Sequence, residues 1–253
     1  MNPRLGKKPA RYDKRTIQLK SILKILPPIP DEWDVDSQFS FQLPTPMFAN
    51  DQYGDCVIVG RAHLTLRFEG YEQKKPIKIT DKDVIDQYLR ESGGLDYGLV
   101  MLESLREWRN NGWRLGQRKI ACLKYGGEFY DIYAYSILEQ GNIEDVRACI
   151  YFLGGCYGGF QLPQSSMDQF NDGQIWDDVG DENIVGGHCV TMCSYNEIGP
   201  IGLTWGKKQQ MTWAFYKKYA DEAYGLVDNK NRFLDNSPLD VEKMEGYLQE
   251  ITR

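Results

Sequence analysis

The chain has 253 residues, of which 42% are hydrophobic and 13% aromatic, so it can bury a substantial core as one large domain or as two lobes. Its net charge of −6 gives it no general surface for neutralising phosphates, which argues against nucleic acid as a partner. The longest nearly apolar run, Ala148 to Phe160, is shorter than the roughly 20 residues that span a bilayer, so we expect no membrane helix and no membrane partner.

The N-terminus is basic but is not followed by the apolar segment of a secretory signal, and we expect synthesis in a reducing cytoplasm. Five cysteines lie mostly in apolar runs and are interpreted as small buried hydrophobes: Cys122, Cys149, Cys156, Cys189 and Cys193. The chain has only two histidines, and on a strand Cys189 and Cys193 would point away from the face of His188. The sequence therefore predicts no metal site and no cofactor.

Residues 1–45 are basic and then proline-rich, with too few periodic apolar positions for a core of their own. We predict an extended arm with little regular structure, because Pro27, Pro28 and Pro30 disfavour a helix. The apolar residues between Ile22 and Ile29 need cover, so the arm should pack on the main domain, residues 46–253, or on a neighbouring subunit. An arm that crosses the cleft at Cys56 would act as a propeptide does.

Helices dominate the sequence pattern from about residue 46 to 155. One begins at Cys56, and another follows Thr80, a predicted N-cap with Asp83 at the capping-box position. A third is amphipathic and ends at Asn111, and a fourth opens at Asn142. This half of the chain is expected to form a helical lobe.

From about residue 156 to 253 the pattern changes to strands. Strands are predicted over 156–163, 188–196, 201–206 and 223–228, with a helix over 212–223 that Thr212 caps. The fold class is therefore α+β, with a helical lobe first and a β lobe second.

Cys56 is the first candidate for chemistry. A cysteine in the first turn of a helix faces unpaired backbone N–H groups and the positive end of the helix dipole, which favour the thiolate. Gly54, two residues earlier, lets a backbone approach without a side chain in the way.

A thiolate needs an acid partner, and only His63 and His188 are available. His63 lies on about the same helix face as Cys56 but roughly 10 Å along the axis, too far to touch the thiol, so we interpret it as a core or interlobe histidine. His188 follows two glycines at the start of a strand, in the lobe that would face the Cys56 helix. It is the expected partner.

These motifs resemble the papain-like cysteine peptidases. "GDC" opens a helix, "GGHCVTMCSY" follows with Tyr195 seven residues after His188, and "LTWG" comes next. Uncharacterised bacterial and phage-encoded papain-like proteins are similar in "NDQYGDC", "GGHCV" and "TWGKKQQMTWAF", and this likeness runs from the arm to about Asp228. The resemblance implies a two-lobed papain-like fold, with a helical lobe carrying Cys56 and an antiparallel β lobe carrying His188.

The resemblance also implies where the other site residues stand. Asn50 occupies the place of the family's oxyanion-hole glutamine, with Gln52 two residues later as the alternative donor. Val57 replaces a tryptophan, and Leu203 stands where an asparagine orients the histidine. Thr204 is the best remaining candidate for that third position, although one residue along a strand points to the opposite face.

Three functions follow as expectations. The first is a cysteine peptidase or amidase that acts on a peptide or protein substrate through a Cys56/His188 dyad and a thioester, with a weak or missing third member. The second is a noncatalytic papain-like protein that uses the arm to join neighbouring structural subunits, for example in a phage virion, where it would then be found. The third is an acyl or glutamyl transferase using the same dyad.

Overall fold

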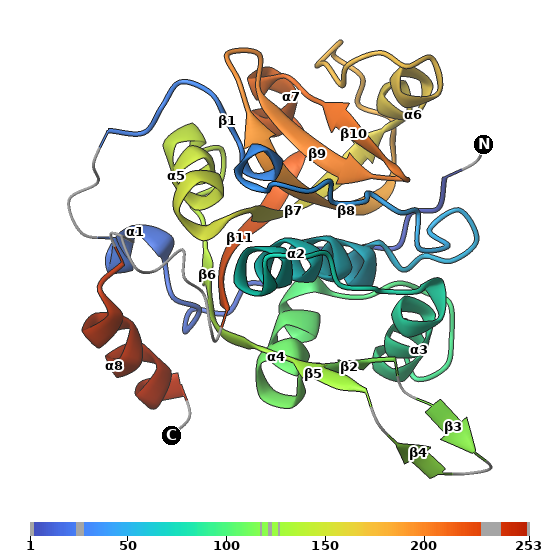
Figure 1. The fold of residues 1–253 in the computed structure, drawn as a ribbon. Helices are drawn as coiled ribbons and strands as arrows, with labels where there is room; N and C mark the ends of the chain where they lie inside the picture. The colour runs from blue at the N-terminus through green and yellow to red at the C-terminus, as the bar shows by residue number, and fades with distance from the viewer. Residues whose placement is uncertain are drawn as a thin grey trace.

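The structure combines helices with antiparallel strands, as the α+β prediction requires, but both kinds of element occur in each half of the chain (Figure 1). The computed structural model describes residues 3–23, 28–116, 118–120, 123–125, 127–228 and 239–251. The helices are α1 (Leu19–Ile22), α2 (Cys56–Gln73), α3 (Asp81–Glu91), α4 (Met101–Asn111), α5 (Ile143–Leu153), α6 (Gln164–Asn171), α7 (Trp213–Tyr219) and α8 (Val241–Ile251), with a 3-10 turn η1 (Val35–Gln38). No helix in these ranges is long and apolar enough to cross a membrane.

The strands of the described residues form one large sheet and two small ones. Within the described ranges, the large sheet has the order β10-β9-β8-β7-β11-β6, and β1 pairs with β8 beside this path. Its pairings are antiparallel, and those of β2 with β5 and of β3 with β4 are antiparallel too. The strands are β1 (Trp33–Asp34), β2 (Trp113–Leu115), β3 (Arg118–Ile120), β4 (Leu123–Tyr125), β5 (Glu128–Tyr130), β6 (Ile132–Ile137), β7 (Cys156–Pro163), β8 (Ile184–Tyr195), β9 (Pro200–Thr204), β10 (Lys207–Gln210) and β11 (Ala220–Asp228).

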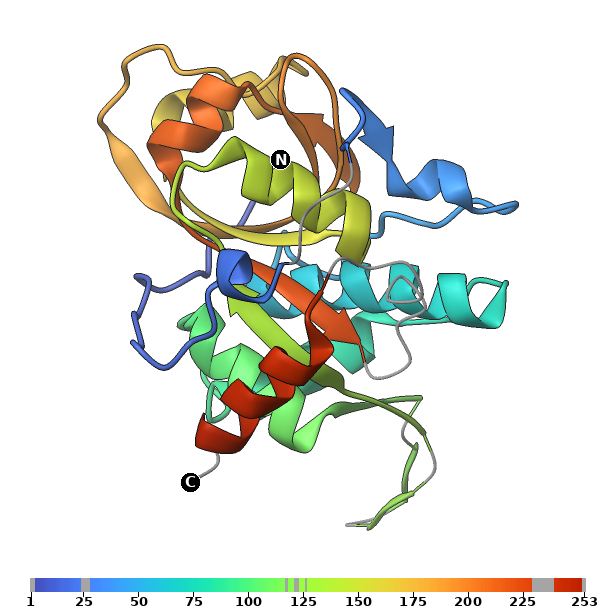
Figure 2. The ribbon, with the colours of Figure 1, turned by 90° about the vertical axis from the view of Figure 1, so that its left-hand side faces the viewer.

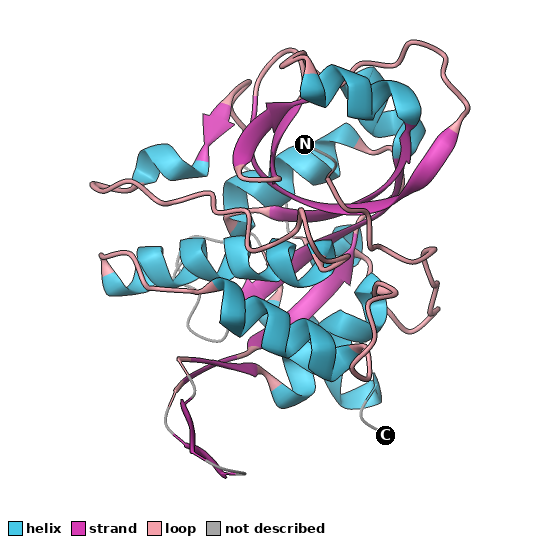
Figure 3. Ribbon diagram, turned by 90° about the vertical axis from the view of Figure 1, so that its right-hand side faces the viewer, coloured by secondary structure: helices cyan, strands magenta, loops and turns pink. Residues whose placement is uncertain are grey.

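Helix α2 lies between the large sheet and helices α3 and α4 (Figures 1 and 3). It is buried from Cys56 to Gly70, on all of its faces, as expected of a central helix rather than a surface one. Two buried arginines on it are neutralised by carboxylates from elsewhere in the chain. Arg61 Nη2 lies 2.7 Å from Glu91 Oε1, and Arg67 Nε lies 2.9 Å from Asp36 Oδ1. These ion pairs hold the helix that carries the thiol in one position.

Three predicted helix starts agree with the structure, and one predicted helix end does not. Thr80 and Asp83 form a capping box at the start of α3, and the Asn142 side chain accepts from two backbone N–H groups of α5, both as predicted. The helix predicted over 212–223 is capped by Thr212 but ends at Tyr219. The next residues begin β11 because they pair with β7, and this tertiary pairing overrides their helix propensity.

The arm contains little regular structure within 3–23 and 28–45: α1, β1 and η1 are all short. Helix α1 lies beside α8, and β1 lies on the edge of the β8 ladder (Figure 2). In the described part of 113–137, the strands β2 to β6 interrupt the otherwise helical half of the chain, and β6 joins the large sheet.

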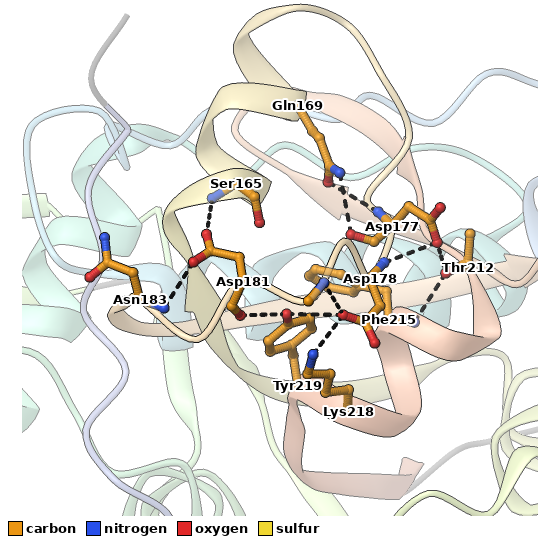
Figure 4. A network of polar contacts seen from close by, with 11 residues as sticks. Ser165, Gln169, Asp177, Asp178, Asp181, Asn183, Thr212, Phe215, Lys218 and Tyr219 are labelled. Atoms are coloured by element: carbon orange, nitrogen blue, oxygen red, sulfur yellow. Dashed lines mark hydrogen bonds and ion pairs between the residues drawn. The ribbon is translucent and has the colours of Figure 1, made fainter.

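Polar contacts anchor the loop that leads into β8 (Figure 4). Asp178 accepts from Lys218 Nζ at 2.7 Å, and Asp181 accepts from the backbone N–H groups of Ser165 and Asn183 at 2.7 and 2.9 Å. Further contacts in the same network join Thr212 Oγ1 to Asp177, Gln169 to Asp177, and Tyr219 OH to the Asp181 carbonyl. The chain therefore enters β8 along a defined path, which positions His188.

Candidate active site

Cys56 is the first residue of α2 and is almost fully buried. Its thiol is approached by the backbone N–H groups of Cys189, on β8, and of Gly6, in the arm. Burial raises the pKa of the thiol to about 12, and the two N–H groups act in the opposite direction because they stabilise the thiolate. The thiol thus sits where the helical part, the β part and the arm meet.

His188 lies on β8, one residue before the Cys189 N–H that reaches the thiol. Its Nε2 lies 2.6 Å from Thr204 Oγ1, and its ring stacks on Trp205 with 4.2 Å between centroids. Its Nδ1 is buried and has no hydrogen-bond partner among the residues that the structure describes. The imidazole is therefore held through one nitrogen while the other is left without a partner.

The register of β8 and β9 explains why Thr204 reaches His188. Thr191 pairs with Leu203, so continuing this antiparallel register by one step places Thr204 opposite Val190. His188 is two residues from Val190 and shares its face of the strand. Leu203, by contrast, pairs with Thr191, whose Oγ1 donates to the Gly60 carbonyl of α2. Thr204, one residue after the position where the resemblance places the orienting asparagine, thus contacts the imidazole of His188.

The loop 47–53 precedes the cysteine and carries the two predicted oxyanion donors. Asn50 is buried, and its amide donates to the Tyr53 carbonyl at 3.1 Å and to Asp55 Oδ1 at 2.9 Å. The Gln52 side chain is exposed. In this conformation the Asn50 amide is engaged within its own loop, and the oxyanion role of either residue stays a prediction.

Asp55 stands directly before the cysteine and is fully buried. Burial raises its pKa to about 8, although the hydrogen bond from Asn50 lowers it. It occupies the N-cap position of α2 without a side-chain capping bond. Sequence reasoning missed this residue, since an aspartate at an N-cap is usually a solvated capping group.

The remaining candidates behave as structural residues. His63 is buried, its Nε2 lies 3.1 Å from the Pro46 carbonyl, and burial lowers its pKa to about 3, which confirms the interpretation of a core histidine. Cys149, Cys156, Cys189 and Cys193 are free and buried, while Cys122 lies outside the described residues. Side-chain oxygens of Glu69, Glu72 and Asp228 lie within 4.8 Å of one another, a spacing that could suit a cation.

Residues 4–8 of the arm run across the site and contact both halves of the molecule. On the helical side, Leu99 N–H donates to the Gly6 carbonyl at 2.8 Å. On the β side, the N–H groups of Gly6 and Lys7 donate to the Gly187 carbonyl at 3.2 and 2.9 Å. A Cβ atom built on Gly6 would lie 1.8 Å from the Gly54 carbonyl oxygen, so only glycine fits here. The close approach expected at Gly54 is thus made by the chain's own arm.

Comparisons with solved structures identify this architecture. Xylellain, a cysteine protease from Xylella fastidiosa, matches with a TM-score of 0.67 over 89% of this chain and 96% of that chain, at 16% identity. A procathepsin B from Trypanosoma congolense matches with a TM-score of 0.58 over 90% of this chain and 87% of that chain, at 13% identity. The fold is papain-like.

A cysteine protease from Carica candamarcensis has the same fold, with a TM-score of 0.55, 10% identity, and coverage of 80% of this chain and 100% of that chain. No protein-family model matches the sequence, and no curated protein matches it. At these identities the likeness shows the papain-like fold alone. The helical part of this papain-like fold carries Cys56, and its sheet carries His188, as predicted.

Proposed function

We propose that the protein is a cysteine peptidase or amidase that uses a Cys56/His188 dyad. His188 takes the proton of Cys56, and the thiolate attacks a carbonyl carbon to form a thioester. His188 then protonates the leaving amine, and water hydrolyses the thioester. The Cys56 N–H, together with the Asn50 or Gln52 amide, stabilises the oxyanion.

One observation carries this proposal: the way His188 is held. Its Nε2 contacts Thr204 at 2.6 Å, its Nδ1 is buried without a partner in the described residues, and the next residue's N–H reaches the Cys56 thiol. A cysteine–histidine pair needs an orienting group on one ring nitrogen and the other nitrogen left open for the thiol, and His188 meets both conditions. Thr204 supplies the orienting contact in place of the family's asparagine.

The arm keeps this site in a resting state. Burial raises the pKa of Cys56 to about 12 and lowers that of His188 to about 3, so both groups are neutral around pH 7 while residues 4–8 lie across the site. A neutral thiol is a poor nucleophile. Displacing residues 4–8 admits water and removes part of both shifts, so activity requires the arm to leave the cleft, as a propeptide does.

Hydrolysis of a fluorogenic peptide library by the full chain carrying Gly6→Val tests this function, because the new side chain cannot fit against Gly54. We expect turnover that is lost in Gly6→Val/Cys56→Ala and in Gly6→Val/His188→Ala. The matched control is Lys14→Ala, an exposed arm residue outside the cleft, which should stay as inactive as the unchanged chain. Turnover that survives the added Cys56→Ala substitution would contradict the proposal. A correctly folded Gly6→Val chain that shows no turnover would contradict it too.

A noncatalytic assembly role, for example in a phage virion, is the second candidate. It is favoured by the depth at which the arm is seated, because Lys7 is buried and ion-paired, as expected for a permanent structural element. A chain whose biological role survives Cys56→Ala but not loss of the arm has this second function. An acyl transferase differs from the peptidase only in its acceptor, and adding a small amine to the assay distinguishes the two by product.

A further inference from the structure

The arm's Lys7 occupies a buried acidic pocket beside Cys56. Its ammonium group is fully buried and lies 2.8 Å from Asp221 Oδ2 and 3.0 Å from Glu222 Oε1. Lys7 directly follows Gly6, whose N–H reaches the Cys56 thiol. The pocket is therefore one residue away from the reacting sulfur along an extended chain.

The two carboxylates are held in place by other residues. Gln161 Nε2 donates to Asp221 Oδ2 at 2.8 Å, and Tyr224 OH donates to Glu222 Oε2 at 2.7 Å. All four residues lie on the neighbouring strands β7 and β11. Because strands position side chains more rigidly than loops do, this is a built site and not a chance surface contact.

The wall of the pocket is shaped for an unbranched aliphatic stem. A Cβ atom on Gly159 would lie 2.2 Å from Lys7 Cε and 2.8 Å from Met101 Sδ, so the Lys7 stem passes directly over the backbone of this strand position. A long apolar stem with a cation at its end is the shape of lysine, and to a lesser extent arginine.

The two carboxylates of the pocket need a positively charged partner. Burial raises the pKa of Glu222, and the Lys7 ammonium is the main influence in the opposite direction. When the arm leaves, the Asp221 and Glu222 carboxylates remain side by side without their cation, which is unfavourable because the Glu222 side chain is only 2% exposed and that of Asp221 22%. A basic side chain from another polypeptide restores the pairing.

We propose that this pocket selects a lysine or arginine side chain next to the scissile bond, so that the substrates are polypeptides with a basic residue at that position. Asp221 and Glu222 are then the specificity-determining residues, and Lys7 of the arm is the occupant that a substrate replaces. The inference rests on the proposed peptidase activity for its catalytic part and on the pocket alone for its binding part.

Matched fluorogenic peptides test the catalytic part in the full chain carrying Gly6→Val. The peptides differ at one position only, which is lysine, norleucine or glutamate, and norleucine has a similar stem without the charge. We expect kcat/KM for the lysine peptide to exceed that for the norleucine peptide roughly 10- to 100-fold, with glutamate slowest. Adding Asp221→Asn and Glu222→Gln should bring the lysine-to-norleucine ratio close to one while iodoacetamide still alkylates Cys56. Equal rates for lysine and norleucine before those substitutions overturn the specificity.

Binding separates a failure of this inference from a failure of the proposed function. In Gly6→Val/Cys56→Ala, calorimetry compares a synthetic peptide of residues 3–10 with the same peptide carrying norleucine at position 7. We expect at least tenfold weaker binding of the norleucine peptide, whether or not the protein is an enzyme, and equal affinities overturn the inference. If Gly6→Val does not fold, Lys7→Glu releases the arm instead, since it places a third carboxylate beside Asp221 and Glu222.

Discussion

The Nε2 atom of His188 and the Oγ1 atom of Thr204 lie 2.6 Å apart in a buried setting, under the ring of Trp205. Loss of this contact in Thr204→Val should lower kcat of the arm-released chain roughly tenfold, the usual net value of one hydrogen bond, because the imidazole is no longer oriented. Thr204→Ser keeps the hydroxyl and should retain most of the rate. Steady-state kinetics with KM measured separately make the comparison, and a Thr204→Val variant as active as its parent would remove Thr204 from the site.

Release of the arm should change the pH dependence of Cys56. With residues 4–8 in place, burial raises the pKa of the thiol to about 12, so alkylation by iodoacetamide should become rapid only at strongly alkaline pH. In Gly6→Val, the rate should rise at a pH well below that of the unchanged chain, because water reaches the thiol and His188. Mass spectrometry of the alkylated peptide follows the rate at each pH. Identical profiles for both chains would show that the arm does not govern the thiol.

Asp55 should make stability depend on pH. Burial raises its pKa from 3.8 to about 8, so the folded chain binds a proton that the unfolded chain releases above pH 4. Its contribution to stability is therefore full below pH 4 and is lost as pH rises to about 8, at up to about 1.4 kcal/mol per pH unit. Asp55→Asn removes this loss and should be more stable than the unchanged chain at pH 8.

Denaturant unfolding between pH 4 and 8 measures that difference. Asp51→Asn is the matched control, since Asp51 is exposed in the same loop and should leave the curve unchanged. If the free energies of unfolding of Asp55→Asn and the unchanged chain stay parallel across this range, Asp55 is ionised in the folded protein.

The buried ion pair of Arg61 and Glu91 should matter far more than an exposed one. Their side chains are 1% and 6% exposed, and Arg61 also donates to the Ser104 carbonyl at 2.8 Å. Glu91→Gln leaves the guanidinium without its counter-charge, and we expect a loss of about 3 to 5 kcal/mol in the free energy of unfolding. Asp86→Asn breaks the exposed pair with Lys82 and should cost less than about 1 kcal/mol. Similar losses for the two variants would contradict this ranking.

The sequence by itself predicted those features that depend on neighbours along the chain. The capping box of Thr80 and Asp83 and the caps at Asn142 and Thr212 are visible because each cap acts on backbone groups two or three residues away. Cys56 at a helix start and His188 on a strand were predicted for the same reason, since periodicity and turn residues are local signals.

The tertiary structure decided everything that depends on contacts between distant segments. Strand pairing with β7 ended the helix at Tyr219 and so placed Asp221 and Glu222 on β11, where they face Lys7. The register of β8 and β9 brought Thr204, the best remaining candidate in the sequence, to His188, because it turns Leu203 to the opposite face of the strand. Burial, a property of the whole fold, raised the pKa of Asp55. Local sequence specifies backbone conformation, whereas charge, proton affinity and access at the site depend on which segments pack together.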